Sequence, residues 1–189
     1  MDWKTVPIPG RMQKLDRDAR GYPIPFNILR DTEGRPHFTI NDHAKAETCI
    51  NERRCPICGD LHGRILWFAG GPMSAFHPAG CYIDQPMHKE CVHYAMKVCP
   101  YLAAPNYGKR LDAKTLDPDK LPEHINTLAD PTMIARRPDV FVLVAAKTYS
   151  LSKSDTPFLH IHPQQRVGYE FWRKGEQLTY EDACVFVPE

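Results

Sequence analysis

Two closely spaced pairs of side chains that suit a tetrahedral zinc ion constrain the fold more than any other feature of this sequence. Cys55 and Cys58 are separated by two residues and followed directly by Gly59. A chain that turns this tightly points both sulfurs to one spot, and glycine relieves the strained backbone. The second pair is His88 and Cys91. In the first turn of a helix, residues three apart share a face, so the sequence predicts one zinc site made by both pairs.

The interval between the two pairs is long enough for a strand hairpin. We predict a helix that begins at about Pro86, with Asp84 or Gln85 as its N-cap, and ends at Cys99. The positive partial charge of a helix N-terminus favours a thiolate over a thiol. A cysteine knuckle, a strand hairpin and a helix with two ligands in its first turn form a treble clef. Residues 49–102 are therefore expected to form a treble-clef zinc lobe.

The remaining cysteines leave one ligand position open. Cys81 is the main rival of His88, because it is the unassigned cysteine closest to that residue in the sequence. Cys49, Cys99 and Cys184 are expected to be core residues. The alternative to a metal site is that Cys55 and Cys58 form an unmetallated turn and that His88 and Cys91 are packing residues. If the protein does supply four ligands, the site is structural, because a catalytic zinc keeps one position open for water.

Length and composition are those of an ordinary globular domain. The chain has 189 residues, of which 42% are hydrophobic and 25% charged, and a core of this size needs no disulfides. Its 18 prolines are spread along the whole chain, which predicts short elements and many ordered loops. We therefore expect a single α+β domain over residues 1–189.

Turn residues and hydrophobic alternation divide this domain into segments. Residues 1–22 are expected to form an extended arm, residues 23–40 a β-hairpin, and residues 139–189 a β-rich C-terminal part. Asn41 or Asp42 is expected to cap a helix that reaches about Asn51. The other expected elements are a strand near residues 64–69, two short helices near 118–128 and 130–137, strands within 139–150, 158–161 and 167–171, and a helix over 180–184 capped by Thr179.

Charge and hydropathy restrict the classes of partner. The net charge is +1, whereas a nucleic-acid-binding domain usually shows a clear basic excess. The first residues contain no apolar segment typical of a secretory signal. The longest apolar run, Val140 to Ala146, is far shorter than the ~20 residues of a membrane span. These features predict a cytoplasmic protein without a membrane partner, in which cysteines are metal ligands or core residues and not disulfides.

Several motifs together resemble an uncharacterised family found in phages and bacterial genomes. They are CPICG at 55–59, GGPMSA at 70–75, QPMHKEC at 85–91 and VCPYL at 98–102, with RGYPIP at 20–25, RPDV at 137–140 and FWRKGE at 171–176. The resemblance covers most of the chain. It implies a phage or mobile-element context and supports Cys55, Cys58, His88 and Cys91 as the metal set. It implies no catalytic residue.

The sequence favours a binding module over an enzyme. It contains no standard phosphate-binding glycine loop, no nucleophile elbow and no clustered carboxylates. The expected partner is a protein of the host or the phage, and the module would inhibit or modulate a host complex. Trp3, Trp67 and Trp172 are either anchors of that interface or, for the last two, core residues.

Three other hypotheses are also compatible with the sequence. An HNH-type nuclease, itself a treble-clef variant, would use His77 as general base and His93 as the spare histidine of the helix. A nucleic-acid-binding zinc finger would gather basic residues near the zinc lobe, namely Arg53, Arg54, Lys89, Lys97, Lys109 and Arg110. His160 and His162 would share a strand face, either as metal ligands or on an exposed edge strand.

Overall fold

The computed structural model describes residues 3–103, 138–152 and 158–186. Its N-terminal segment is packed against the core and does not form the expected extended arm. Two short 3-10 turns, η1 (Trp3–Thr5) and η2 (Gly10–Met12), divide it. Met12 is buried, and Val6 and Ile8 pack against the same core cluster. The apolar side chains spaced along this segment supply the reason, since an arm in solvent would leave them in water.

The expected hairpin and the helix after it are both present. β1 (Ile28–Arg30) pairs antiparallel with β2 (Pro36–Asn41), although the first strand is shorter than predicted. α1 (His43–Asn51) follows, and the side chain of Asp42 caps it by accepting a hydrogen bond from the backbone N–H of Lys45. Within α1, Cys49 is fully buried, as predicted.

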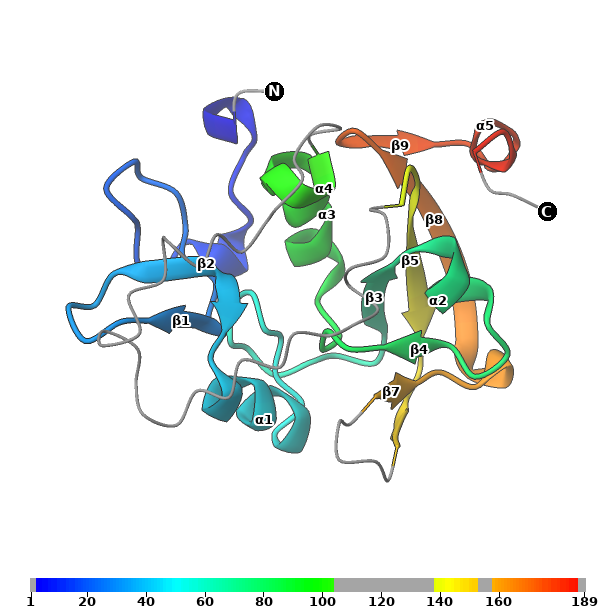
Figure 1. The fold of residues 1–189 in the computed structure, drawn as a ribbon, viewed down its shortest axis with the longest axis horizontal. Coiled ribbons are helices and arrows are strands. Elements are labelled where there is room, and N and C mark those ends of the chain that lie inside the picture. The colour runs from blue at the N-terminus through cyan, green and yellow to red at the C-terminus, as the bar shows by residue number, and fades with distance from the viewer. Residues whose placement is uncertain (1–2, 104–137, 153–157, 187–189) are drawn as a thin grey trace.

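A four-stranded antiparallel sheet organises the rest of the described chain (Figure 1). Its strands, in spatial order, are β3 (Leu66–Gly70), β5 (Phe141–Ala146), β8 (Arg166–Arg173) and β9 (Glu176–Leu178). Every residue of β5 is buried. Alternate residues of β5 belong to two core clusters, with Phe141 and Leu143 on one face and Val142 and Val144 on the other.

A second, three-stranded sheet covers one of these faces. β7 (Leu159–His160) lies at its centre, between β4 (Cys81–Tyr82) and β6 (Ser150–Leu151). The expectation of an exposed edge strand at His160 is therefore wrong. Two short helices accompany the sheets, α2 (Pro72–Phe76) and α5 (Tyr180–Cys184). Thr179 caps α5 through its side chain, as predicted.

The strand hairpin expected between the cysteine knuckle and the following helix is not formed. β3 pairs with β5 and β4 pairs with β7, so the two strands of the interval have separate partners. β5 supplies a continuous apolar strand on which β3 can bury Leu66 and Phe68 completely. The two-residue strand β4 could not do this. The α+β class is confirmed, whereas the treble-clef topology of residues 49–102 is not.

The main helix begins three residues later than predicted. α3 (Lys89–Val98) is preceded by Met87, which forms a pair of backbone hydrogen bonds with Trp67 of β3, at 2.7 and 3.0 Å. This bridge keeps Met87 extended, so Pro86 cannot start the helix. α4 (Pro100–Ala103) follows directly. In Figure 1, α3 lies between the sheet and the part that contains β1, β2 and α1.

The two predicted helices near 118–128 and 130–137 lie outside the described residues. None of the helices in the described ranges is long and apolar enough to cross a membrane. One face of the four-stranded sheet packs on α3, where Val92 and Met96 share a core cluster with Leu143. This packing positions the N-terminus of α3 beside the cysteine knuckle.

Candidate metal centre

The side chains of Cys55, Cys58, His88 and Cys91 converge in the structure. Their potential ligand atoms all lie within 4.8 Å of one another. All four residues are buried, and the most accessible of them, His88, retains only 6% exposure. Within the described residues, no other group of three or more histidine, cysteine or acidic residues has the spacing to hold a metal ion. The two sequence pairs therefore form one cluster.

The knuckle owes its shape to backbone hydrogen bonds on both sides of the turn. The N–H of Gly59 donates to the carbonyl oxygen of Cys55 at 2.8 Å, and the N–H of Cys55 donates to that of Asp60 at 2.9 Å. Gly59 has a φ of +76°, in the region that favours glycine. A Cβ there would also lie 3.0 Å from the ring of Phe26. Glycine is thus required by both conformation and space.

The second pair joins the cluster from the start of α3. His88 is the N-cap residue, with extended backbone angles, and Cys91 is the third residue of the helix. We predicted both ligands inside the first turn, but only Cys91 is helical. The pair still converges, because N-cap and third-position side chains face each other at a helix start, as in a capping box.

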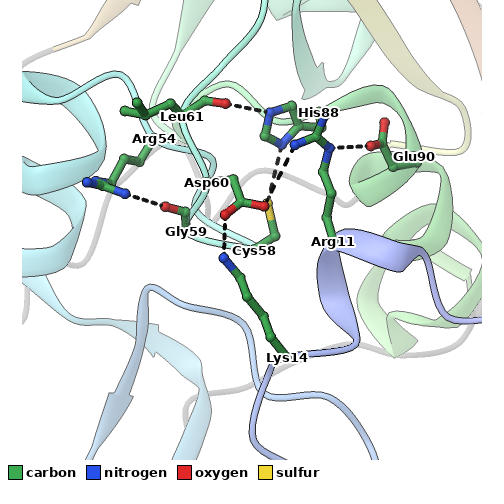
Figure 2. A network of polar contacts seen from close by, with 9 residues as sticks. All are labelled: Arg11, Lys14, Arg54, Cys58, Gly59, Asp60, Leu61, His88 and Glu90. Atoms are coloured by element: carbon green, nitrogen blue, oxygen red, sulfur yellow. Dashed lines mark hydrogen bonds and ion pairs between the residues drawn. The ribbon is translucent and has the colours of Figure 1, made fainter.

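The imidazole of His88 has a partner on each ring nitrogen. Nδ1 lies 3.3 Å from the sulfur of Cys58, inside the cluster, and Nε2 lies 3.0 Å from the carbonyl oxygen of Leu61 (Figure 2). A carbonyl oxygen can only accept, so Nε2 carries the proton and Nδ1 has its lone pair free toward the sulfurs. An outer hydrogen bond of this kind is what orients metal-binding histidines.

The electrostatics of the three thiols suit a cation. Burial raises the pKa of the Cys55 thiol, but hydrogen bonds from Cys58 and Cys91 lower that pKa by more. The pKa of Cys91 changes in the opposite direction, because its hydrogen bonds to Cys55 and Cys58 raise it. Without a cation, three sulfurs this close cannot all ionise, because their like charges repel. A divalent ion would stabilise three thiolates together, so the residues present fit a metal.

Charged side chains hold the outer surface of the cluster together. Arg11 of η2 donates to Glu90 of α3 at 2.6 Å and lies 3.7 Å from Asp60. Lys14 pairs with Asp60, and Arg54 donates to the carbonyl oxygen of Gly59 at 2.9 Å. Figure 2 shows these contacts around His88 and Cys58. The N-terminal segment thus connects the knuckle to α3, a role that the expected extended arm would not have had.

Three other cysteines, Cys81, Cys99 and Cys184, are not part of the cluster. Cys81 is in β4, and its sulfur lies 3.4 Å from Nδ1 of His160, so the structure brings His88 and not Cys81 to the other three ligands. Cys99 is partly buried at the end of α3. Cys184 is exposed, which corrects the prediction of a core residue. It is the last residue of α5, where the neighbouring Ala183 takes the buried position.

The two histidines that the nuclease hypothesis requires, His77 and His93, contact residues outside the metal cluster. His77 is exposed at the end of α2, where its Nδ1 accepts the N–H of Ala79. His93 lies 2.6 Å from the carboxylate of Glu170 on β8, which also pairs with Lys89 at 2.9 Å. The two histidines belong to separate polar groups. His162 is exposed, and His160 has Cys81 as its neighbour.

Some residues that lie near the cluster were not predicted from the sequence to contribute to it. The ring of His62 packs on that of His88 with centroids 5.1 Å apart, and burial lowers the pKa of His62 to about 4, so it is neutral at neutral pH. Leu61 contributes a backbone carbonyl, which no side-chain pattern indicates. Trp172 is buried and Trp67 and Trp3 are partly buried, so Trp172 is a core residue and not an exposed anchor.

Comparison of the chain with protein-family models, with curated proteins and with solved structures finds no match in any of the three. The geometry of the cluster is therefore the basis for assigning a role to this protein.

Proposed function

We propose that Cys55, Cys58, His88 and Cys91 bind one zinc ion in a structural site. The observation that carries this proposal is the convergence of three sulfurs and one imidazole, all buried and within 4.8 Å. Soft thiolates with one imidazole in a four-ligand site favour zinc over magnesium or calcium, which take oxygen ligands. With four protein ligands, no position remains for the water that a catalytic zinc activates.

The zinc would add a direct link between two separate segments of the chain. Cys55 and Cys58 belong to the knuckle after α1, whereas Cys91 belongs to α3, which packs on the large sheet. Binding energy at such a site is folding energy, since the unfolded chain has no preformed site. The role of the metal is then to keep the knuckle and its attached hairpin in place.

We infer that the protein works as a binding module of phage or mobile-element origin, and that its partner is a host or phage protein. An exposed aromatic surface supports a protein partner. Phe76, Tyr169 and Tyr180 are 46%, 40% and 65% exposed. Ring contacts of 5.7 to 6.4 Å connect Phe76 with Tyr169 and Phe171, and Phe171 with Tyr180. Exposed aromatic clusters of this kind are typical of protein interfaces.

Two measurements test the proposal. Elemental analysis of the purified protein should find one zinc per chain, and cobalt substitution should produce the absorption of a tetrahedral site with sulfur ligands. A folded protein without bound metal would contradict the zinc site. For the partner, cross-linking in host lysate should capture one protein with the wild type and lose it with Phe76→Ser plus Tyr169→Ser. The variant Lys97→Gln, altered at an exposed position on α3, should still capture it.

A further inference from the structure

A pocket of about 470 Å³ opens beside the cysteine knuckle. Its walls come from the segment after η2, the segment before β1, the start of α1, and the knuckle itself through Cys58 and Gly59. The volume lies within the range of roughly 300–1,000 Å³ found for small-molecule sites. The pocket is outside the metal cluster, although the two share the knuckle.

The charge of this pocket differs from that of the whole chain. Among the described residues that line it, four side chains are cationic and one, that of Asp16, is a carboxylate. The cations are Lys14, Arg30, Lys45 and Arg54. The described lining thus has more cations than carboxylates, whereas the whole protein has a net charge of only +1. A concave surface with this excess attracts an anion.

Each of the four cations has a carboxylate partner, and these partners differ in their exposure to water. Asp60, which pairs with Lys14, and Asp42, which lies 3.8 Å from Lys45, have side chains that are 33% and 20% exposed. Arg30 pairs with Asp16 at 2.7 Å, and the side chain of Asp16 is 74% exposed. Arg54 pairs with Glu52 at 2.7 Å, and the side chain of Glu52 is 53% exposed. Exposed ion pairs contribute little to stability, because water screens them. A phosphate that enters the pocket can therefore displace the carboxylates from Arg30 and Arg54 or share these cations with them. Its approach to Lys45 competes only with an ion pair of 3.8 Å, to Asp42.

One side of the pocket is apolar. Ile24 is 4% exposed, and Leu15, Pro25 and Phe26 complete this wall. The ammonium of Lys45 lies 5.8 Å from the centre of the Phe26 ring. A ligand with a charged group and a flat apolar group would satisfy both sides. Aromatic side chains such as Phe26 are surfaces on which nucleobases stack.

We propose that this pocket binds the phosphate of a nucleotide, with Arg30 and Lys45 as its main ligands and the base against Phe26. Guanidinium and ammonium groups are the usual protein ligands of phosphate. The phosphate could belong to a free nucleotide or to a nucleic-acid strand, since the chemistry of the group is shared. The inference rests on the proposed zinc site in one respect, because the knuckle that forms one wall carries two of the metal ligands. Arg54 is itself held there by the carbonyl oxygen of Gly59 (Figure 2).

The test is a titration of the isotope-labelled, zinc-loaded full chain with inorganic phosphate, AMP, adenosine and a short 5′-phosphorylated single-stranded oligonucleotide. AMP should shift the backbone signals of Ile24 and Phe26 in a saturable way, and adenosine should not. Arg30→Gln plus Lys45→Gln should weaken AMP binding by about tenfold or more, since each phosphate contact of this type is charge-assisted. The control Lys97→Gln plus Lys147→Gln removes the same charge at two exposed positions outside the pocket and should bind like the wild type.

The source of the phosphate follows from the comparison of ligands. Equal affinity for AMP and the oligonucleotide would show that a free nucleotide is sufficient for binding. Saturable binding of the oligonucleotide alone, weakened in the pocket variant, would show that the phosphate belongs to a nucleic-acid strand. Zinc content is measured on every sample. Fully zinc-loaded wild type that shows no saturable shifts at Ile24 and Phe26 with any phosphate ligand would overturn the pocket proposal and leave the zinc site intact. Equal losses in the pocket and control variants would also overturn it.

Discussion

Nε2 of His88 donates a hydrogen bond to the backbone carbonyl oxygen of Leu61 at 3.0 Å. Leu61 follows the knuckle closely, so the knuckle orients the imidazole that completes its own cluster. The other ring nitrogen, Nδ1, then points to the sulfur of Cys58 at 3.3 Å. Because the donor is fixed by a backbone group, the protonated nitrogen of His88 is set by the fold and not by a neighbouring side chain.

The first prediction concerns this tautomer. In the zinc-loaded protein, the imidazole of His88 should bind the metal through Nδ1 and carry its proton on Nε2. Nitrogen-15 spectra of labelled histidine side chains distinguish the two nitrogens, and His88→Gln identifies the signal. A spectrum with the metal on Nε2 would contradict the orientation given by Leu61.

The second prediction separates the ligand cysteines from the others. Cys58→Ser replaces a soft thiolate by a poor ligand and should abolish zinc binding and unfold the knuckle. Cys184→Ser changes an exposed residue and should leave zinc content and thermal stability unchanged. Cys49→Ala removes one buried sulfur and should cost about 1–2 kcal/mol of stability while keeping the metal. Elemental analysis and thermal unfolding of the three variants provide the comparison.

The third prediction decides between the rival ligands. Cys81 is in β4 beside His160, whereas His88 lies in the cluster. Cys81→Ala should therefore retain one zinc, and His88→Ala should bind zinc measurably more weakly in competition with a chelator. Loss of metal from Cys81→Ala together with retention by His88→Ala would show a site with four cysteines instead.

The ligand set was predictable because its spacing is local. Cys55 and Cys58 form a turn, and Gly59 marks its positive φ. The pair His88 and Cys91 remains on one side of the chain whether the helix begins at Pro86 or at Lys89, so an error in the helix start does not move the ligands apart. Two of the three predicted caps are confirmed, since Asp42, predicted together with Asn41, caps α1 and Thr179 caps α5. The third prediction, Asp84 or Gln85, is wrong, because the N-cap of α3 is His88.

The parts that were wrong depend on contacts distant in sequence. β3 pairs with β5, and each paired residue of β5 lies more than seventy positions later in the chain. Leu66, for example, pairs with Ala146. No local pattern in the sequence shows that β3 would pair with the distant strand β5 and not with β4, its expected hairpin partner. The same holds for Pro86, which is kept out of the helix by the bridge between Met87 and Trp67. The N-terminal segment packs because Met12 finds a core built by later residues.

The fourth prediction concerns Arg166, whose guanidinium binds backbone carbonyls of two segments. It donates to Ala75 at 2.9 Å, to His77 at 2.7 Å and to Ile161 at 3.0 and 3.2 Å. Arg166→Lys supplies one nitrogen in place of this fork and leaves carbonyls without a donor, so stability should fall by about 1–3 kcal/mol.

Denaturant unfolding measures the loss at Arg166, with Arg64→Lys at an exposed position as the matched control. Zinc content should be unchanged in both variants, because neither residue is part of the cluster. Equal stability of Arg166→Lys and wild type would show that the fork contributes nothing.

The last prediction concerns the acid dependence of stability and Asp31, which begins the turn between β1 and β2. Burial would raise the pKa of its carboxyl, but hydrogen bonds from the backbone N–H of Arg35, its guanidinium, His37 and the N–H of Glu33 outweigh burial and hold the pKa well below its usual value. The folded-state pKa is thus below the unfolded value of about 3.9. The stabilisation is complete above the unfolded pKa and is lost as pH falls through the folded one.

Asp31→Asn should therefore be less stable than wild type at pH 7, and the difference between the two should shrink as the pH is lowered below about 4. Acid also releases metal from cysteine sites, but this affects both proteins alike, so the difference between their unfolding curves isolates Asp31. Asp139→Asn, at an exposed position, should match the wild type at every pH. A difference at Asp31 that stays constant from pH 7 down to acid unfolding would mean that its charge does not stabilise the turn, and that the hydrogen-bonded shape alone does.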